Sequence, residues 1–365
     1  MSIDSISTEL LLFFLLYGGT TVAALIACLY LLFCKGNAFV EGVTPPERLR
    51  LWAAAFFAVV FLGHIWWLLF YLYSGDYNSV SCMVVSILDG MTLMTTIPGT
   101  LFAMLQDRQR TVWPIIMATV PYAVLLELSL VYPGSHYADI AVVYVMVIYV
   151  AFTVYMIFAV RQYRRWLRDN YADLEHKEVM LSHVMIISIL LLIITYGFDN
   201  DNLTISYFVQ GTELVLIGLM LWRVETLPQL VDVSLEPLEY AEPEIQQPTA
   251  IPSNIEQLLD EQCVATQLYL QCDLTLIQLA QAVGTNRFYL SQYFSRHGIT
   301  YNAYINDLRI NHFVNLYREA TATHKSVTAQ QLANDSGYRS YSTFSLAFKQ
   351  RMGESVTAWM HEMAV

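Results

Sequence analysis

Long apolar runs fill most of the first 223 residues of this chain of 365 residues. Hydrophobic residues make up 56% of the chain and charged residues only 14%, which is too apolar for an ordinary soluble protein. Each run is close to or above the roughly 20 residues that a helix needs to cross a bilayer. We therefore expect seven membrane-spanning helices, at residues 9–34, 49–73, 80–105, 111–131, 138–160, 180–197 and 204–222.

Basic residues in the connecting segments lie on one side of these expected spans. The N-terminal tail and the second, fourth and sixth connections have no Lys or Arg. Because basic loops stay in the cytoplasm, the N-terminus is expected outside and the C-terminus inside. A soluble helical core, the alternative interpretation, would not need this asymmetry. The basic residues follow the first, third and fifth spans: Lys35, Arg48 and Arg50; Arg108 and Arg110; Arg161, Arg164, Arg165, Arg168 and Lys177.

Four ionisable residues fall within the expected spans: His64, Asp89, Glu127 and Glu213. Burial of such groups in hydrocarbon is costly, so they are candidates for a sensing site that opens to the outside. The alternative is that they only join helices through hydrogen bonds. The outer loops are too short to form a binding domain, so the stimulus is expected to reach the bundle itself. It would be a small molecule, a property of the lipid, or a partner membrane protein.

An acidic segment follows the last expected span. Residues 224–273 contain ten Asp or Glu and no Lys or Arg, and five prolines lie from Pro228 to Pro252. This composition is typical of an extended tether. Ser253 is the expected N-cap of an amphipathic helix that packs on the following domain, with dimerisation through it as the alternative. Its apolar side carries Ile255, Leu258, Leu259, Val264 and Leu268. The expected domains are 1–223, 224–252 and 253–365.

Residues 274–353 contain one supersecondary unit twice. In both copies an apolar helical face ends at a glycine (Gly284 or Gly337), and a second helix with two inward apolar residues follows. A helix, a tight turn and a second helix form a helix-turn-helix, whose second helix can enter the DNA major groove. The inward residues are Leu276, Leu279, Ala280, Val283, Leu290 and Phe294 in the first copy, and Leu332, Ala333, Phe344 and Phe348 in the second.

The segment that joins the two copies has helical spacing and no Gly or Pro. As a helix, residues 301–320 would span roughly 30 Å. This length is close to the ~34 Å between major-groove faces one helical turn apart. A joining helix of this length could hold both second helices on one side of a duplex.

These residues resemble the DNA-binding domain of the AraC/XylS family of transcription regulators. The resemblance covers about the last hundred residues and none of the first 250. Phe313 departs from it, because the family's connecting helix usually has a small residue there, and Val356 and Met360 replace a usual Pro and Arg. The residues that carry the resemblance are Leu274, Leu276, Leu279, Ala280, Gly284, Leu290 and Phe294; Tyr304, Leu308, Arg309 and Ile310; and Ser336, Gly337, Tyr338, Thr343, Phe344, Phe348, Lys349 and Gly353.

Helical periodicity selects the side chains expected to contact DNA. Gln292 can pair with adenine and Phe288 can contact a thymine methyl, whereas Arg287, Arg339 and Lys349 are expected at phosphates. Leu346 lies where relatives commonly have a polar residue. The alternative for each charged residue is an ordinary solvated surface charge. The full candidate set is Arg287, Phe288, Ser291, Gln292, Ser295, Arg296, Arg339, Ser342, Ser345, Leu346 and Lys349.

Together, these features predict an all-α membrane-bound transcription regulator in a bacterial cytoplasmic membrane. The fold expected is a polytopic seven-helix transmembrane bundle followed by a soluble double helix-turn-helix domain. Expected partners are double-stranded DNA, membrane lipid, a second copy of the chain, RNA polymerase, and an unidentified small ligand or membrane protein. No catalytic, metal or cofactor motif is found, so we expect no enzyme. The competing hypothesis is a membrane receptor or transporter-like protein whose C-terminal domain binds a protein.

Overall fold

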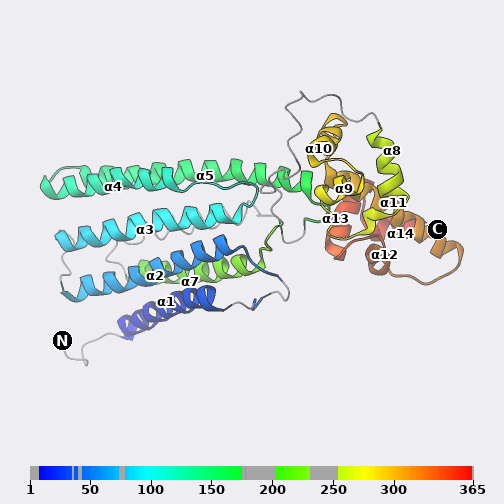
Figure 1. Ribbon diagram of the computed structural model, residues 1–365. Helices are drawn as coiled ribbons and strands as arrows, with labels where there is room; N and C mark the ends of the chain where they lie inside the picture. Colours follow the sequence, from blue (N-terminus) through cyan, green and yellow to red (C-terminus); the bar gives the residue numbers. More distant parts are fainter. Residues whose placement is uncertain are drawn as a thin grey trace, which may run out of the picture. The chain divides into compact units, whose positions relative to one another are not determined.

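The computed structural model describes residues 8–34, 37–39, 43–73, 79–132, 134–174, 177, 203–230 and 254–363. The contacts divide the chain into two compact units. The first is made of Met1–Tyr163 and Val179–Val231, and the second of Arg164–Glu178 and Asp232–Val365. In the described residues all regular elements are helices (Figure 1).

The first unit contains six described helices that are long and apolar enough to cross a membrane. Their bounds lie within a few residues of six of the seven expected spans, apart from the end of α5. The expected span at 180–197 lies outside the described residues, so a count of seven is not shown. The helices are α1 (Thr8–Phe33), α2 (Glu47–Tyr73), α3 (Val80–Met104), α4 (Trp113–Val131), α5 (Tyr137–Asn170) and α7 (Leu203–Thr226).

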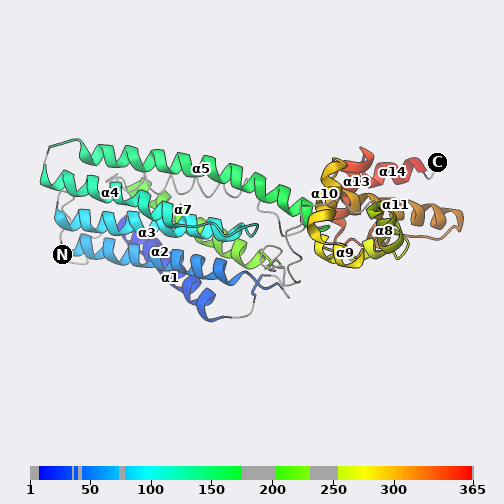
Figure 2. The same ribbon diagram turned by 45° about the horizontal axis from the view of Figure 1, so that its top comes forward.

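Helix α2 has the most described neighbours in this unit, because it packs against α1, α3 and α7. In Figures 1 and 2, α4 and α5 lie on the other side of α3 from α2. Many large apolar side chains remain exposed on the outer faces of these helices, for example Leu15, Leu72 and Phe158. Such surfaces are expected to face lipid, because exposed apolar patches of this extent are rare on soluble monomers.

The end of α5 differs from the expectation of a basic loop after residue 160. The helix continues through Arg161 and Arg168 to Asn170. No Gly or Pro interrupts this stretch, and Tyr163 and Leu167, one helical turn apart, are fully buried. Burial of this pair extends the helix beyond its apolar part. The end of α5 therefore belongs to the second compact unit, which the expected domain bounds did not include.

The second unit contains both predicted helix-turn-helix units. Its elements are α8 (Ile255–Leu259), a π-helical turn (Asp260–Val264), a 3-10 turn (Leu268–Leu270), α9 (Leu276–Ala282), α10 (Arg287–Arg296), α11 (Tyr301–Ala322), α12 (Ala329–Asp335), α13 (Tyr341–Met352) and α14 (Val356–Met363). Helices α9 and α10 form the first helix-turn-helix, and α12 and α13 form the second. Helix α11 joins them as one helix of 22 residues, or roughly 33 Å.

The sequence repeat extends to the helix caps. Thr275 and Thr328 cap α9 and α12, and in each case a glutamine three residues later completes a capping box. These paired bonds satisfy backbone N–H groups that the first turn of a helix leaves open. Gly284 and Gly337 both adopt positive φ, at 72° and 85°, a conformation that other residues rarely take. The two turns therefore form for the same local reasons.

The segment before α9 packs as expected on the first helix-turn-helix. Ile255, Leu259 and Cys263 join the core that contains Leu279 and Leu290. The expected single helix is wrong in detail, because α8 ends at Leu259 and continues as the π-helical turn. Ser253 lies outside the described residues, and Asn254 occupies the N-cap without a capping side-chain bond.

The departures from the family pattern lie within the second core. Phe313 is fully buried, and its ring centroid lies 4.5 Å from that of Phe344 and 5.6 Å from that of Phe348. Val356 and Trp359 of α14 complete the same core, with Met360 packed against it. A large side chain on α11 therefore fills the space between α13 and α14.

A close backbone approach at Gly337 joins the second helix-turn-helix to the first core. A Cβ atom at Gly337 would lie 2.6 Å from the carbonyl oxygen of Leu270, whereas one at Gly353 would meet nothing within 4 Å. Both glycines have nearly the same positive φ, 85° and 84°. A substitution at either glycine would strain the backbone equally, but only a substitution at Gly337 would also clash with a neighbour.

We expect Gly337→Ala to destabilise the second unit more than Gly353→Ala does. Strain in the left-handed region costs about 1–2 kcal/mol in both variants, and the clash with Leu270 adds about 1–3 kcal/mol only at Gly337. Hydrogen exchange of the α12 and α13 amides in the full-length protein would measure the difference. Equal losses in the two variants would contradict the close approach.

Candidate functional site

The first candidate recognition helix, α10, presents its expected outer face to solvent. Leu290 and Phe294 are buried, and Asn286 caps the helix through a bond from the Tyr289 N–H. Phe288 is 62% exposed; Ser291, Ser295 and Arg296 are exposed, and Gln292 is half-buried. Arg287 differs, because it is half-buried and its Nε donates to Asn170 Oδ1 at 3.0 Å.

The second candidate helix, α13, repeats this arrangement. Phe344 and Phe348 are fully buried, whereas Leu346 is 62% exposed. Arg339, Ser342 and Lys349 are exposed and Ser345 is half-buried. The exposed Phe288 and Leu346 offer apolar surface suited to thymine methyl groups, and the serines offer hydroxyl groups. The predicted residues thus form two outward faces, while their contact with DNA stays a prediction.

Arg309 of α11 lies at the joint between the two helix-turn-helix units. Its side chain donates to the carbonyl oxygens of Tyr269 and Gln271, both at 2.7 Å, and to Cys272 at 3.3 Å. Its guanidinium carbon lies 5.4 Å from the centre of the Tyr338 ring. Burial lowers the pKa of this guanidinium from its usual value, but an arginine remains charged.

Helical spacing in the sequence indicates that Arg309 is buried, although no role was predicted for it. Residues 305, 309 and 313 fall one turn apart, and Ile305 and Phe313 are both fully buried. An arginine on such a buried stripe must find acceptors, because burial of an unpaired charge is strongly unfavourable. Helical periodicity alone could therefore have marked Arg309 as an internal joint.

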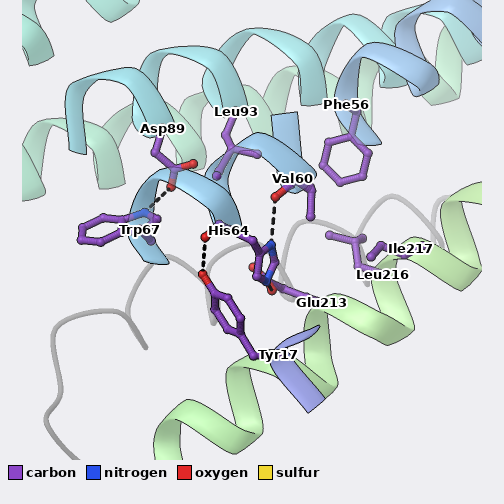
Figure 3. Close-up of a pocket in the computed structure, with 11 residues that line it drawn as sticks. Tyr17, Phe56, Val60, His64, Trp67, Asp89, Leu93, Glu213, Leu216 and Ile217 are labelled. Carbon is purple, nitrogen blue, oxygen red and sulfur yellow. Dashed lines mark hydrogen bonds and ion pairs between the residues drawn. The ribbon is translucent and has the colours of Figure 1, made fainter. Parts of the chain in front are cut away.

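Three of the four ionisable residues expected in the spans meet in the first unit (Figure 3). His64 of α2, Asp89 of α3 and Glu213 of α7 line one pocket together with Tyr17 of α1. Tyr17 donates from its hydroxyl to the His64 carbonyl oxygen at 2.7 Å. Glu127 of α4 is exposed and does not line this pocket.

His64 links α2 to α7. Its Nδ1 lies 2.8 Å from the Val60 carbonyl oxygen, and its Nε2 lies 3.1 Å from both Gln210 Oε1 and Glu213 Oε2. The direction required for a hydrogen bond is met at Gln210, and the contact with Glu213 has the N–O distance of an ion pair. Glu213 Oε2 is buried without a hydrogen bond from any described residue. The contact with His64 is therefore the polar interaction that stabilises this buried carboxylate oxygen.

Asp89 links α3 to α2. Its Oδ2 accepts from Trp67 Nε1 at 3.3 Å. Its Oδ1 would lie 2.7 Å from a Cβ at Gly63, so α2 and α3 approach closely at this point. These contacts fit the alternative of hydrogen bonds that join helices, and they leave a sensing role as a proposal.

The enclosed space at this cluster is small. The cavity has a volume of about 40 Å³, which is enough for a few water molecules but far below the roughly 300–1,000 Å³ of sites for drug-sized ligands. A larger pocket of about 310 Å³ lies between α3, α4 and α5, next to Pro98, and is almost wholly apolar. In this conformation the polar cluster has room for water, whereas the apolar pocket has room for an organic molecule.

Comparison with known proteins identifies the C-terminal part alone. Residues 279–362 match a family model described as a helix-turn-helix domain, of the AraC type. The match begins within α9 and ends within α14. It therefore includes helix α10 of the first helix-turn-helix and both helices, α12 and α13, of the second. No curated protein and no solved structure matches the chain. The chain thus carries a DNA-binding type of domain after helices of membrane-spanning length.

We expect Glu213→Ala to destabilise the first unit by about 1–3 kcal/mol, because it removes the buried ion-pair contact with His64. Glu127→Ala is the matched control, because Glu127 is exposed on α4, and it should change stability by less than about 0.5 kcal/mol. Thermal unfolding of both variants in detergent would measure the difference. Equal melting temperatures for the two variants would show that the contact between His64 and Glu213 contributes nothing.

Proposed function

We propose that this protein is a membrane-bound transcription regulator that binds promoter DNA through its second compact unit. The observation that carries the proposal is the pair of outward faces on α10 and α13, joined by the single helix α11. The helix-turn-helix match over residues 279–362 supports DNA as the ligand. Six helices of membrane-spanning length support a location in the membrane.

The two candidate faces favour recognition of two neighbouring groove segments. Helix α11 is roughly 33 Å long, close to the ~34 Å between groove faces one turn apart. Residues 274–365 contain eight Lys or Arg against five Asp or Glu, so neutralisation of phosphates gives only weak non-specific affinity. Tight binding therefore needs both faces together, or two copies of the protein, because each added contact site raises avidity.

Orientation follows from the distribution of basic residues. With Lys and Arg confined to alternate connections, the second unit would lie in the cytoplasm, where DNA is present. The sensing part of the proposal rests on the cluster of His64, Asp89 and Glu213, since this cluster contacts α1, α2, α3 and α7. A change in its charge or hydration would alter how these helices pack.

Selection of genomic fragments by the full-length protein in detergent tests the DNA-binding part. We expect enrichment of one sequence class, with footprints over two neighbouring major-groove segments. On that sequence Gln292→Ala should cost about 1–3 kcal/mol and relax the preference at one base pair. Lys349→Ala should weaken binding to all sequences alike, because a phosphate contact carries no sequence information.

Two results of this selection would contradict the proposal. Enrichment of no sequence would favour the receptor-like alternative, in which the C-terminal domain binds a protein. Protection of a single groove segment would show that only one of the two faces reads DNA.

Transcription from the selected promoter tests the sensing part. Asp89→Asn and Glu213→Gln keep the side-chain shape but remove a charge from the cluster, so we expect them to shift reporter output at least severalfold. Glu127→Gln, outside the cluster, should leave output unchanged at equal protein level and membrane insertion. Identical output from all three variants across a range of pH, salt and lipid composition would argue against a sensing role.

A further inference from the structure

The end of α5 and the residues after it are built into the first helix-turn-helix. We call residues 170–173 the clasp segment. Ala172 is 2% exposed and belongs to the core that also contains Leu274 and Tyr301. Tyr171 forms an isolated antiparallel bridge with Thr275, and the Ala172 N–H donates to the Leu274 carbonyl oxygen at 3.2 Å. A segment that follows an apolar helix thus completes the DNA-binding type of domain.

Asn302 of α11 holds the clasp segment from its other side. Its amide donates to the carbonyl oxygens of Tyr171 at 3.2 Å and Ala172 at 2.7 Å. The backbone of the clasp segment is therefore bonded to α11 as well as to the start of α9. Besides these hydrogen bonds, all four residues of the clasp segment are buried. A short segment of this kind can open separately from the rest of a core.

The clasp segment also engages the first residue of the recognition helix α10. Asn170 is 3% exposed, and its Oδ1 accepts from Arg287 Nε at 3.0 Å. Burial lowers the pKa of Arg287, which means that the guanidinium has lost part of its hydration. Arg287 is the residue of α10 that the sequence predicts to contact a DNA phosphate. A phosphate that approached its Nε–H would have to compete with Asn170 for this donor.

A carboxylate lies next to the same helix. Asp169, one residue before the clasp segment, lines a cavity of about 340 Å³ with Ser291 and Ser295 of α10. Both serines belong to the face proposed to approach DNA. The Asp169 carboxylate opposes the approach of a phosphate to these two serines, while the neighbouring Arg168 carries the opposite charge. The bond of the clasp segment to Arg287 is therefore the main contact that opposes DNA.

The second helix-turn-helix shows a related contact. Arg339, its proposed phosphate contact, donates from Nη2 to Asp273 Oδ2 at 2.6 Å, and Lys177 Nζ lies 3.7 Å from Asp273 Oδ1. Lys177 follows the clasp segment by a few residues and lies over the Tyr171 ring. Arg287 is thus paired with the clasp segment itself, whereas Arg339 is paired with Asp273 outside it.

We propose that the clasp segment is an autoinhibitory contact, which must leave the first helix-turn-helix before Arg287 and α10 engage DNA. This inference rests on the proposed function. Because α5 is one of the six apolar helices, its end is a direct route by which a change in the membrane part reaches the recognition helix. Molecules in which the segment is docked cannot bind DNA. The apparent affinity for DNA is therefore the intrinsic affinity multiplied by the fraction of molecules in which the segment is released.

Two measurements on the full-length protein in detergent test this contact, with a labelled mixed-sequence duplex as the probe at fixed salt. The first compares duplex affinity of Asn170→Ala with that of wild type and of Asn315→Ala, an exposed asparagine of α11. Loss of one hydrogen bond to a charged group should tighten binding about tenfold in Asn170→Ala. Asn315→Ala should bind like wild type.

The second measurement needs no variant. Hydrogen exchange at the Ala172 amide of the wild type should rise when the duplex binds, because its bond to Leu274 opens. Exchange of the α9 and α10 core amides shows whether Asn170→Ala folds. If this variant does not fold, exchange at the Ala172 amide of the wild type tests the autoinhibitory contact by itself.

Three results separate the possibilities. Tighter binding by Asn170→Ala, or faster Ala172 exchange with duplex, supports autoinhibition. Equal or weaker binding by a folded Asn170→Ala, or slower Ala172 exchange with duplex, overturns it and leaves the regulator intact, since the segment would then position Arg287 for DNA. Failure of every variant, including wild type, to bind the duplex overturns the proposed function and this inference with it.

Discussion

The buried guanidinium of Arg309 is the contact on which the geometry of the second unit depends. It satisfies three carbonyl oxygens in the turn before α9 and lies against the Tyr338 ring after α12. A charge this deeply buried is stable only when all its partners stay in place. Because those partners lie directly before the first helix-turn-helix and in the turn of the second, Arg309 joins the two. The close approach of Gly337 to Leu270 acts at the same joint.

The sequence was informative wherever a local pattern decides the structure. Apolar runs located six helices of the first unit, and the repeated glycine turns located α9, α10, α12 and α13. The two glycines adopt positive φ and the two threonine caps form in the same way, since caps and turns depend on a few neighbouring residues. The inward faces of α10 and α13 followed from the 3.6-residue period alone.

The sequence was less informative wherever contacts between distant residues decide the structure. Charge and position did not separate Glu127 from Glu213, yet only Glu213 meets His64, 149 positions earlier in the chain, at 3.1 Å. The extension of α5 was missed because its basic residues suggested a loop, while the burial of Tyr163 and Leu167 that stabilises it as a helix depends on tertiary contacts. Periodicity can indicate that a face is apolar but not which segment covers it.

Helix α5 has an apolar part that suits lipid and a charged part that suits water, within one continuous helix. From Tyr137 to Val160 it exposes apolar side chains of the kind that lipid accepts, and from Arg161 it carries charges that lipid excludes. Helical structure continues to Asn170, directly before the bridge of Tyr171 with Thr275. The last residue of this helix is therefore followed directly by a residue that pairs with the start of the first helix-turn-helix.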